Sequence, residues 1–310
     1  MNPVRSLLLA GSESEWLRRQ AMQRTFVRRA VSRFMPGETL DDAIAAAEAL
    51  RSQRLSSLLT QLGENVRSAA QARGVADHYL EVVRRIREAD LDGEVSVKLT
   101  QLGLDVSEAE ATDNLARIAD CARGLRGRLW VDMESSVYTE RTFEVFRAVR
   151  ARYPRLGIAV QAYLHRSAGD VDLLIAEGAA VRLVKGAYRE SSRIAMRRKA
   201  DVDENFFRLA VRMLEPDSRR KGAWLAAGTH DPRLIARIEE HARVAAVPAD
   251  EFEFAMLYGI RRPEQLRLAS AGYRCRVLVS YGAHWFPWYM RRLAERPANL
   301  LFAMRGIAGQ

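Results

Sequence analysis

Several classes of protein are excluded by what this chain of 310 residues has little of. Its two cysteines, Cys121 and Cys275, are too few for a disulfide framework or a thiolate metal site, and such scarcity is typical of a reducing cytoplasm. No uncharged run reaches the roughly 18 residues that a membrane-spanning helix needs. The short apolar run at residues 7–10 is soon followed by Glu13 and does not resemble a secretory signal. We therefore expect a cytoplasmic protein.

The motifs of several common enzyme classes are also missing. No Gly-x-Gly-x-x-Gly follows an apolar run, which argues against an open sheet that binds a dinucleotide. No histidine pair has metal-ligand spacing and no Gly-x-Ser-x-Gly occurs, so we expect neither a catalytic metal nor esterase chemistry.

Lysine is scarce: of 49 basic residues, only Lys98, Lys185, Lys199 and Lys221 are lysine. Lys98 and Lys185 stand at the ends of apolar runs, either by chance or because an ammonium group is needed there. The formal charge of +10 suggests nucleic acid, but basic residues are spread along the chain without a binding motif, so no such partner is expected. A basic face could instead favour anionic lipid and peripheral attachment at the inner face of the membrane.

Short apolar runs alternate with amphipathic segments along most of the chain. The runs predict strands at residues 55–62, 95–100, 129–133, 158–164, 181–187, 224–229, 252–258 and 277–281. The segments between them predict helices at residues 77–88, 109–123, 140–152, 171–177, 205–214, 232–241 and 263–271. Eight such units in about 250 residues are typical of an α/β fold, the (β/α)8 TIM barrel; a doubly wound open sheet is the alternative.

The first part of the chain is predicted to be helical. Helices are expected at residues 13–34 and 41–54, the second capped by Thr39. We therefore divide the chain into an N-terminal helical arm, residues 1–54, and a barrel domain, residues 55–310.

Polar and titratable side chains follow nearly every predicted strand. In a barrel these strand ends meet on one face, where active sites form. Buried charges are costly unless paired, so we expect Lys98 to pair with Asp132, and Glu64 with an arginine. The set comprises Glu64, Lys98, Asp132, Glu134, Gln161, Tyr163, Arg182, Lys185, Tyr188, Thr229, His230, Asp231, Leu257, Tyr258 and Tyr281.

Two of these residues leave alternatives open. Lys98 could be a Schiff-base nucleophile, although an adjacent Asp132 would keep it charged. His230 could be a base or a metal ligand, although a lone histidine beside Asp231 is more often a hydrogen-bonded structural group.

The segment 281–297 follows the last strand and carries the adjacent arginines Arg291 and Arg292. Arginine is suited to bidentate capture of a carboxylate, which favours a helix that closes the barrel mouth over an anionic substrate. A solvated basic helix is the alternative.

Seven motifs occur in one order along residues 55–301. They are Lys98-Leu99-Thr100, Val131-Asp132-Met133-Glu134, Gln161-Ala162-Tyr163, Arg182-Leu183-Val184-Lys185-Gly186-Ala187-Tyr188, Thr229-His230, Met256-Leu257-Tyr258-Gly259 and Arg291-Arg292-Leu293-Ala294-Glu295-Arg296-Pro297. In these motifs the chain resembles the flavin-dependent proline dehydrogenases, whose fold is a distorted (β/α)8 barrel. The resemblance implies FAD, oxidation of L-proline to 1-pyrroline-5-carboxylate and transfer of electrons to a membrane quinone. A separate pyrroline-5-carboxylate dehydrogenase would then take up the product.

The same resemblance implies roles for individual residues. The expected catalytic residues are Lys98, Asp132, Arg182 and Tyr188. The expected substrate-binding residues are Lys98, Ala187, Tyr188, Leu257, Leu278, Arg291 and Arg292, with Glu64 and Arg291 as a gate. The expected FAD-binding residues are Gln161, Arg182, Val184, Lys185, Gly186, Thr229, His230 and Glu295.

Three positions depart from the family pattern. Leu278 stands where a tyrosine usually borders the proline ring. Ala255 stands where a glutamine usually precedes the Met-Leu-Tyr-Gly motif, and Arg189 where an aromatic residue often follows Gly-Ala-Tyr. The aliphatic wall at Leu278 raises the alternative that the substrate is a proline analogue, such as hydroxyproline, a methylproline or pipecolate. Leucine would favour an apolar substituent, because a hydroxyl there would lose its water partner.

Two other classes of function compete with this hypothesis. One is a catalytically retired barrel that binds a partner, against which the retained charged residues argue. The other is a Schiff-base lyase that uses Lys98, which borohydride trapping would test.

Overall fold

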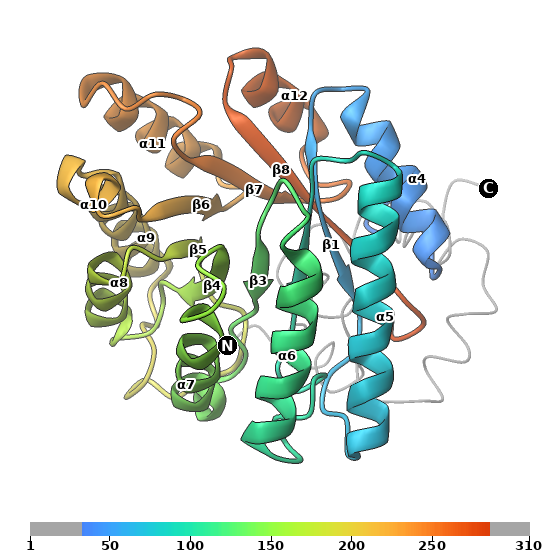
Figure 1. The fold of residues 1–310 in the computed structure, drawn as a ribbon. Coiled ribbons are helices and arrows are strands. Elements are labelled where there is room, and N and C mark those ends of the chain that lie inside the picture. Colours follow the sequence, from blue (N-terminus) through green and yellow to red (C-terminus); the bar gives the residue numbers. More distant parts are fainter. Residues whose placement is uncertain (1–32, 286–310) are drawn as a thin grey trace, which may run out of the picture.

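The computed structural model describes residues 33–285, whose strands form a closed barrel (Figure 1). Each strand lies parallel to the next, and β8 returns to pair with β1 from Ser56 opposite Arg276 to Gln61 opposite Tyr281. The strands are β1 (Ser56–Gln61), β2 (Gly93–Val97), β3 (Leu129–Val131), β4 (Leu156–Gln161), β5 (Ala180–Val184), β6 (Trp224–Gly228), β7 (Glu253–Leu257) and β8 (Arg274–Tyr281). The closed barrel confirms the predicted TIM fold and rules out the open sheet.

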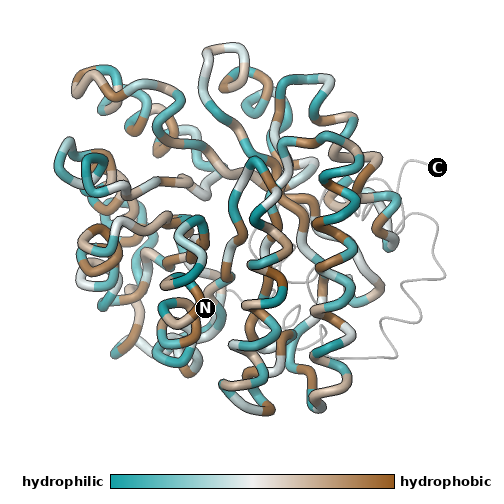
Figure 2. Tube along the Cα trace, viewed as in Figure 1, coloured by the Kyte–Doolittle hydropathy of each residue, from teal (hydrophilic) through white to brown (hydrophobic). Residues whose placement is uncertain are grey.

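Helices surround the strands. They are α5 (Ala69–Glu88), α6 (Glu108–Ala122), α7 (Thr139–Arg150), α8 (Ser167–Ala176), α9 (Lys199–Leu214), α10 (Pro216–Arg220), α11 (Pro232–Val244) and α12 (Arg262–Ser270), with a 3₁₀ turn at Ser136–Tyr138. Figure 2 shows polar and apolar residues alternating along α5 and α6, as expected of helices that bury one face. On α5, for example, Ala76, Tyr79, Val82 and Val83 are buried against the barrel.

An additional helix, α4 (Leu40–Arg51), packs against β8 and β1. It begins where predicted: the Thr39 side chain accepts the Asp42 N–H, and the Asp42 carboxylate accepts the Thr39 N–H. Its buried alanines belong to the same core as the barrel. The division of the chain at residue 54 stays a prediction.

Some element boundaries differ from the predictions. Helices α5 and α9 begin at Ala69 and Lys199, earlier than the predicted residues 77 and 205. The first turn of α5 consists of small alanines and Gln71, and that of α9 carries the exposed Lys199 and Asp201, so neither shows the periodicity of large apolar residues used for prediction, although Ser68 does cap α5. The short α10 and the 3₁₀ turn were not predicted. Most of the predicted helix 13–34 and all of the closing segment beyond Trp285 lie outside the described residues.

Side chains fill the barrel interior in layers. At the amino ends of the strands, the Arg276 Nε lies 3.0 Å from both Glu94 and Glu253. Above this layer, Leu278 packs against a cluster of Leu58, Trp130, Ala180 and Ala226. The layer at the carboxyl ends is charged again, and it contains the candidate site.

No helix between residues 33 and 285 combines the length and the apolar character that crossing a lipid bilayer requires.

Candidate active site

Asp132, directly after β3, is the centre of the charged upper layer. Its carboxylate accepts hydrogen bonds from Lys98 Nζ at 3.1 Å, from Ser96 Oγ at 2.7 Å and from Arg182 Nη2. Arg182 Nη2 also lies 3.0 Å from Ser96 Oγ. The predicted pair of Lys98 and Asp132 is therefore present, and Arg182 joins it from β5.

Two cations fix the charge of Asp132. Burial alone would raise the pKa of this carboxyl, but Lys98 and Arg182 lower it to about 2. In the same way, burial would lower the pKa of Lys98, but Asp132 raises it above its ordinary value. Lys98 therefore remains an ammonium group at neutral pH, which disfavours the Schiff-base alternative because that chemistry needs a neutral amine.

Glu134, two residues further along, is held in a different way. It accepts hydrogen bonds from the Thr100 N–H at 3.1 Å and from Thr100 Oγ1 at 2.7 Å. Burial raises the pKa of Glu134 to about 7, although Lys98 and Thr100 oppose the shift. The backbone carbonyl of Glu134 in turn receives Gln161 Nε2 at 3.3 Å, which orients the side chain at the end of β4.

Two buried polar atoms in this layer, Gln161 Oε1 and Arg182 Nη1, have no hydrogen-bond partner among residues 33–285. The Arg182 guanidinium also lies 5.4 Å from the ring centroid of Trp130. Orphaned buried polar atoms of this kind fit a ligand with hydrogen-bonding ring atoms, such as a flavin. Gly186 lets the Tyr163 ring lie close against the backbone after β5, because a Cβ there would be 2.2 Å from that ring.

A second cluster of ion pairs lies at the barrel mouth, beyond the carboxyl ends of β5 and β6. Lys185, just after β5, pairs with Asp203 of α9 and lies 3.1 Å from Asp231, and Lys199 lies 3.2 Å from Asp231. Partial burial would raise the pKa of Asp231, but Lys185 lowers it to about 2. The Lys185 ammonium is thus held by two carboxylates at this edge of the barrel.

His230 takes part in a backbone hydrogen bond. Its Nε2 accepts the Leu257 N–H at 2.8 Å, so its ring proton resides on Nδ1. Its neighbour Thr229 accepts the Asp231 N–H at 3.1 Å. Between residues 33 and 285 no group of three or more potential metal ligands occurs.

The remaining predicted residues are placed as follows. Val184 ends β5, and Ala187 and Tyr188 follow in the loop to α9. Leu257 ends β7, and the Leu278 carbonyl of β8 accepts the Tyr258 N–H at 3.0 Å. Glu64 lies in the loop after β1 and lines a cavity together with Lys98. Arg291, Arg292 and Glu295 lie outside the described residues, so the proposed gate and lid are untested.

Several residues that build this site were missed in the sequence. Ser96 and Trp130 support the Asp132 cluster from below, and Glu190 holds the loop after Tyr188 by accepting the Ser136 N–H at 2.8 Å. The period-two alternation of each strand was the available signal, because Ser96 precedes Lys98 by two and Trp130 precedes Asp132 by two. Glu190 and Asp203 are in a long loop and the helix after it, where no periodicity marks them.

Comparisons with known proteins agree with this geometry. The family model described as proline dehydrogenase matches residues 43–305. Proline dehydrogenase 1 of Bacillus subtilis (strain 168) is 38% identical over 275 residues, covering 89% of each chain. Proline dehydrogenase of Deinococcus radiodurans is 35% identical over 280 residues, again 89% of each chain. Among solved structures, proline utilization A from Bdellovibrio bacteriovorus, inactivated by N-propargylglycine, has a TM-score of 0.78 at 25% identity; the alignment covers 86% of this chain and 32% of that one.

Proposed function

Since the chain belongs to the proline dehydrogenase family and is an oxidoreductase acting on proline, we propose that it oxidises L-proline to 1-pyrroline-5-carboxylate with FAD and passes the electrons to a membrane quinone. The observation that carries the proposal is the cluster of Lys98, Asp132 and Arg182, partly or fully buried at the carboxyl ends of the strands. A separate pyrroline-5-carboxylate dehydrogenase would take up the product.

FAD would lie over the carboxyl ends of β4 to β6. Gln161 and Arg182 would hydrogen-bond it through their orphaned atoms, and Val184, Gly186, Thr229, His230 and Glu295 would complete its site. Lys185 would act from the edge of this site, since two carboxylates already hold its ammonium. When bound, FAD supplies the acceptor for the hydride that leaves the carbon beside the ring nitrogen of proline.

The substrate carboxylate needs fixed positive charge. Lys98 supplies it, because Asp132 keeps the ammonium protonated and accepts one of its hydrogen bonds. Arg291 and Arg292 would complete the clamp from the closing segment, and Arg291 would pair with Glu64 while the site is empty. A substrate pinned in this way is oriented for hydride transfer, which is how binding energy lowers the barrier of such a reaction.

The substrate ring would lie against apolar walls. Ala187, Tyr188 and Leu257 come from the loops and strand ends around the mouth, and Leu278 belongs to the interior cluster that contains Trp130. These side chains would exclude water from the reacting carbon while the ring nitrogen stays free to lose its proton.

Anaerobic bleaching of the purified flavoprotein by L-proline tests the proposal. We expect rapid loss of the oxidised flavin spectrum with L-proline and return of that spectrum when a short-chain quinone is added. A yellow protein that L-proline does not bleach would contradict the proposed substrate, and a reduced protein that quinone does not reoxidise would contradict the proposed acceptor.

Leu278 supports a second candidate, a dehydrogenase of a substituted or larger cyclic imino acid. Its side chain is part of an apolar wall, so a methylproline or pipecolate should be used better, relative to proline, than hydroxyproline. We expect Leu278→Tyr to lower kcat/KM for the larger substrates relative to proline by about tenfold. Unchanged kcat/KM ratios in Leu278→Tyr would show that this wall does not select the substrate.

A further inference from the structure

Four loops at the carboxyl face of the barrel are joined to one another by side-chain hydrogen bonds. They are the loops that follow β1, β2, β3 and β5, and each of them begins beside or contains a residue of the candidate site. Five residues make these bonds, and together we call them the belt: Asn65, Asp105, Ser136, Tyr138 and Glu190.

Glu190 joins the loop after β5 to the loop after β3. Its Oε1 accepts the Ser136 N–H at 2.8 Å, and its Oε2 accepts the Ser136 hydroxyl at 2.6 Å. Ser136 is the first residue of the 3₁₀ turn, and Ser135, which stands at the N-cap position, makes no side-chain cap. The Glu190 carboxylate therefore caps this turn from a different loop, at the end where the N–H groups of a helical turn lack partners within the turn.

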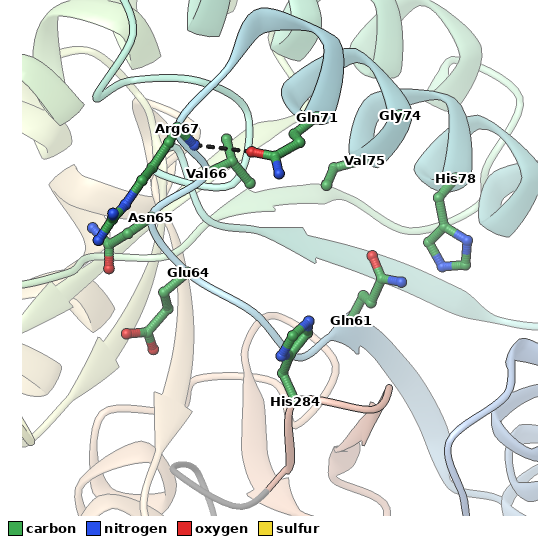
Figure 3. Close-up of a pocket in the computed structure, with 10 residues that line it drawn as sticks. All are labelled: Gln61, Glu64, Asn65, Val66, Arg67, Gln71, Gly74, Val75, His78 and His284. Carbon is green, nitrogen blue, oxygen red and sulfur yellow. Dashed lines mark hydrogen bonds between the residues drawn. The ribbon is translucent and has the colours of Figure 1, made fainter. Parts of the chain in front are cut away.

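The other bonds of the belt are made at the end of the 3₁₀ turn. Tyr138 Oη donates to Asp105 Oδ1 at 2.9 Å, and Asn65 Nδ2 lies 2.9 Å from Asp105 Oδ2 and 3.2 Å from Tyr138 Oη. Asn65 has a φ of +56°, a conformation that asparagine adopts more readily than most residues. Figure 3 shows Asn65 next to Glu64 on the loop after β1. The belt thus fixes the backbone beside Glu64 as well as the 3₁₀ turn.

The loop between β5 and α9 is anchored near both of its ends. The Lys185 carbonyl accepts the Tyr163 N–H at 2.9 Å, and the Met196 N–H donates to the Tyr163 carbonyl at 2.8 Å. Glu190 adds an anchor between these two points, only two residues after Tyr188. A bidentate bond in the middle of a long loop restricts the conformations of that loop, so less entropy is lost when a ligand packs against it.

We propose that Glu190 is a positioning residue: by binding Ser136 it holds Tyr188 where the substrate ring packs, and it thereby limits the size of ring that the site accepts. This inference rests on the proposed function, in which Tyr188 contacts the substrate. Without the bond to Ser136, Tyr188 is free to move away from the ring. The site then fits proline less well and excludes a six-membered ring less strictly. Lys98 is not part of the belt, so its contact with the substrate carboxylate should persist.

Steady-state kinetics of the FAD-loaded enzyme with L-proline and L-pipecolate, expressed per bound flavin, test the proposal. We expect Glu190→Ala to raise KM for L-proline by about fivefold or more, with kcat changed by less than about twofold, because the lost contact contributes to binding. The ratio of kcat/KM for pipecolate to that for proline should rise by about threefold or more. A purely structural role would lower the amount of active enzyme and leave KM and this ratio unaltered.

Two further variants separate the hydrogen bond from the side chain that makes it. Glu190→Gln keeps an oxygen that can accept the Ser136 N–H, so it should restore most of KM and of the substrate ratio. Ser136→Ala removes one of the two bonds and should act in the same direction as Glu190→Ala, with a smaller effect. Combined with Glu190→Ala it should add little, because the two residues act through one contact.

Glu240→Ala is the matched control. The Glu240 carboxylate also accepts two hydrogen bonds, from Arg243 on the exposed last turn of α11, and this pair is not part of the belt. Its variant should keep KM and the substrate ratio.

Unaltered KM and substrate ratio in Glu190→Ala would overturn the proposal, as would equal changes in Glu240→Ala. If Glu190→Ala does not fold or bind FAD, by circular dichroism and flavin absorbance, Ser136→Ala decides: unaltered KM and ratio in that variant overturn the proposal. Failure of the unaltered protein to be reduced by L-proline would instead overturn the proposed function.

Discussion

At the barrel mouth, the single carboxylate of Asp132 pairs with two cations, Lys98 and Arg182. Asp132→Asn would keep the shape but leave two partly buried cations facing each other. We expect the free energy of unfolding to fall by about 3 kcal/mol, as when one member of a buried ion pair is removed. Urea denaturation measures it, and Ser96→Ala, which removes a neutral donor to the same carboxylate, should cost about 1 kcal/mol. Equal losses in the two variants would contradict the assigned role.

Glu134 makes stability depend on pH in the opposite sense from most carboxylates. Its pKa is raised from 4.5 to about 7, so the folded state binds the proton more tightly than the unfolded chain does. Stability from this group is present below about pH 4.5 and is lost as the pH rises to about 7. Glu134→Gln cannot ionise, so the variant does not lose this stability as the pH rises. Its free energy of unfolding, minus that of the unaltered protein, should therefore increase by about 2–3 kcal/mol from pH 4 to pH 8.

Denaturant unfolding of the apoprotein over this pH range tests the assignment. Other groups that titrate there, such as His78, whose pKa burial lowers, are present in both proteins and cancel in the difference. A difference that stays constant with pH would mean that Glu134 is ionised in the folded state at an ordinary pKa.

At the scale of single elements, the helix glycines offer a stability test separate from function. Gly74 in α5 and Gly169 in α8 both have free space where a Cβ would be. We expect Gly74→Ala and Gly169→Ala each to raise the free energy of unfolding by about 0.5–1 kcal/mol, since alanine restricts the unfolded chain and favours the helix. Thermal or urea unfolding measures both. A loss of stability in Gly74→Ala alone would show that α5 has a packing reason for its glycine.

The sequence predicted the existence and order of the strands well, because the buried strands are continuous apolar runs such as residues 158–160 of β4. It predicted the pair of Lys98 and Asp132 because both follow strands that end on one face. It could not predict α10, which is only five residues long, or the start of α9, where Lys199 and Asp201 are exposed. Contacts such as Lys185 with Asp203 depend on how a loop folds back, and no local pattern records that.

On the scale of the whole molecule, Arg276 helps to close the barrel. From β8 it binds Glu253 of β7, lies 3.0 Å from Glu94 of β2 and donates to the Ser57 carbonyl of β1 at 3.1 Å. Arg276→Met would leave two buried glutamates without their cation, and we expect a loss of about 3–5 kcal/mol. Hydrogen exchange should show the added opening first at the pairing of β1 with β8. Normal protection of β1 and β8 in this variant would contradict a role in closure.

Trp285, just beyond β8, donates its Nε1 hydrogen to Glu38 at 2.9 Å, although 247 positions separate the two residues along the chain. Closing the loop between Glu38 and Trp285 lowers the entropy of the chain more than closing a short loop does, and this loop contains all eight strands. We therefore expect it to form last during refolding. The fluorescence of the Trp285 indole would then report closure of the barrel. During refolding it should reach its final value after the helical signal of circular dichroism has done so.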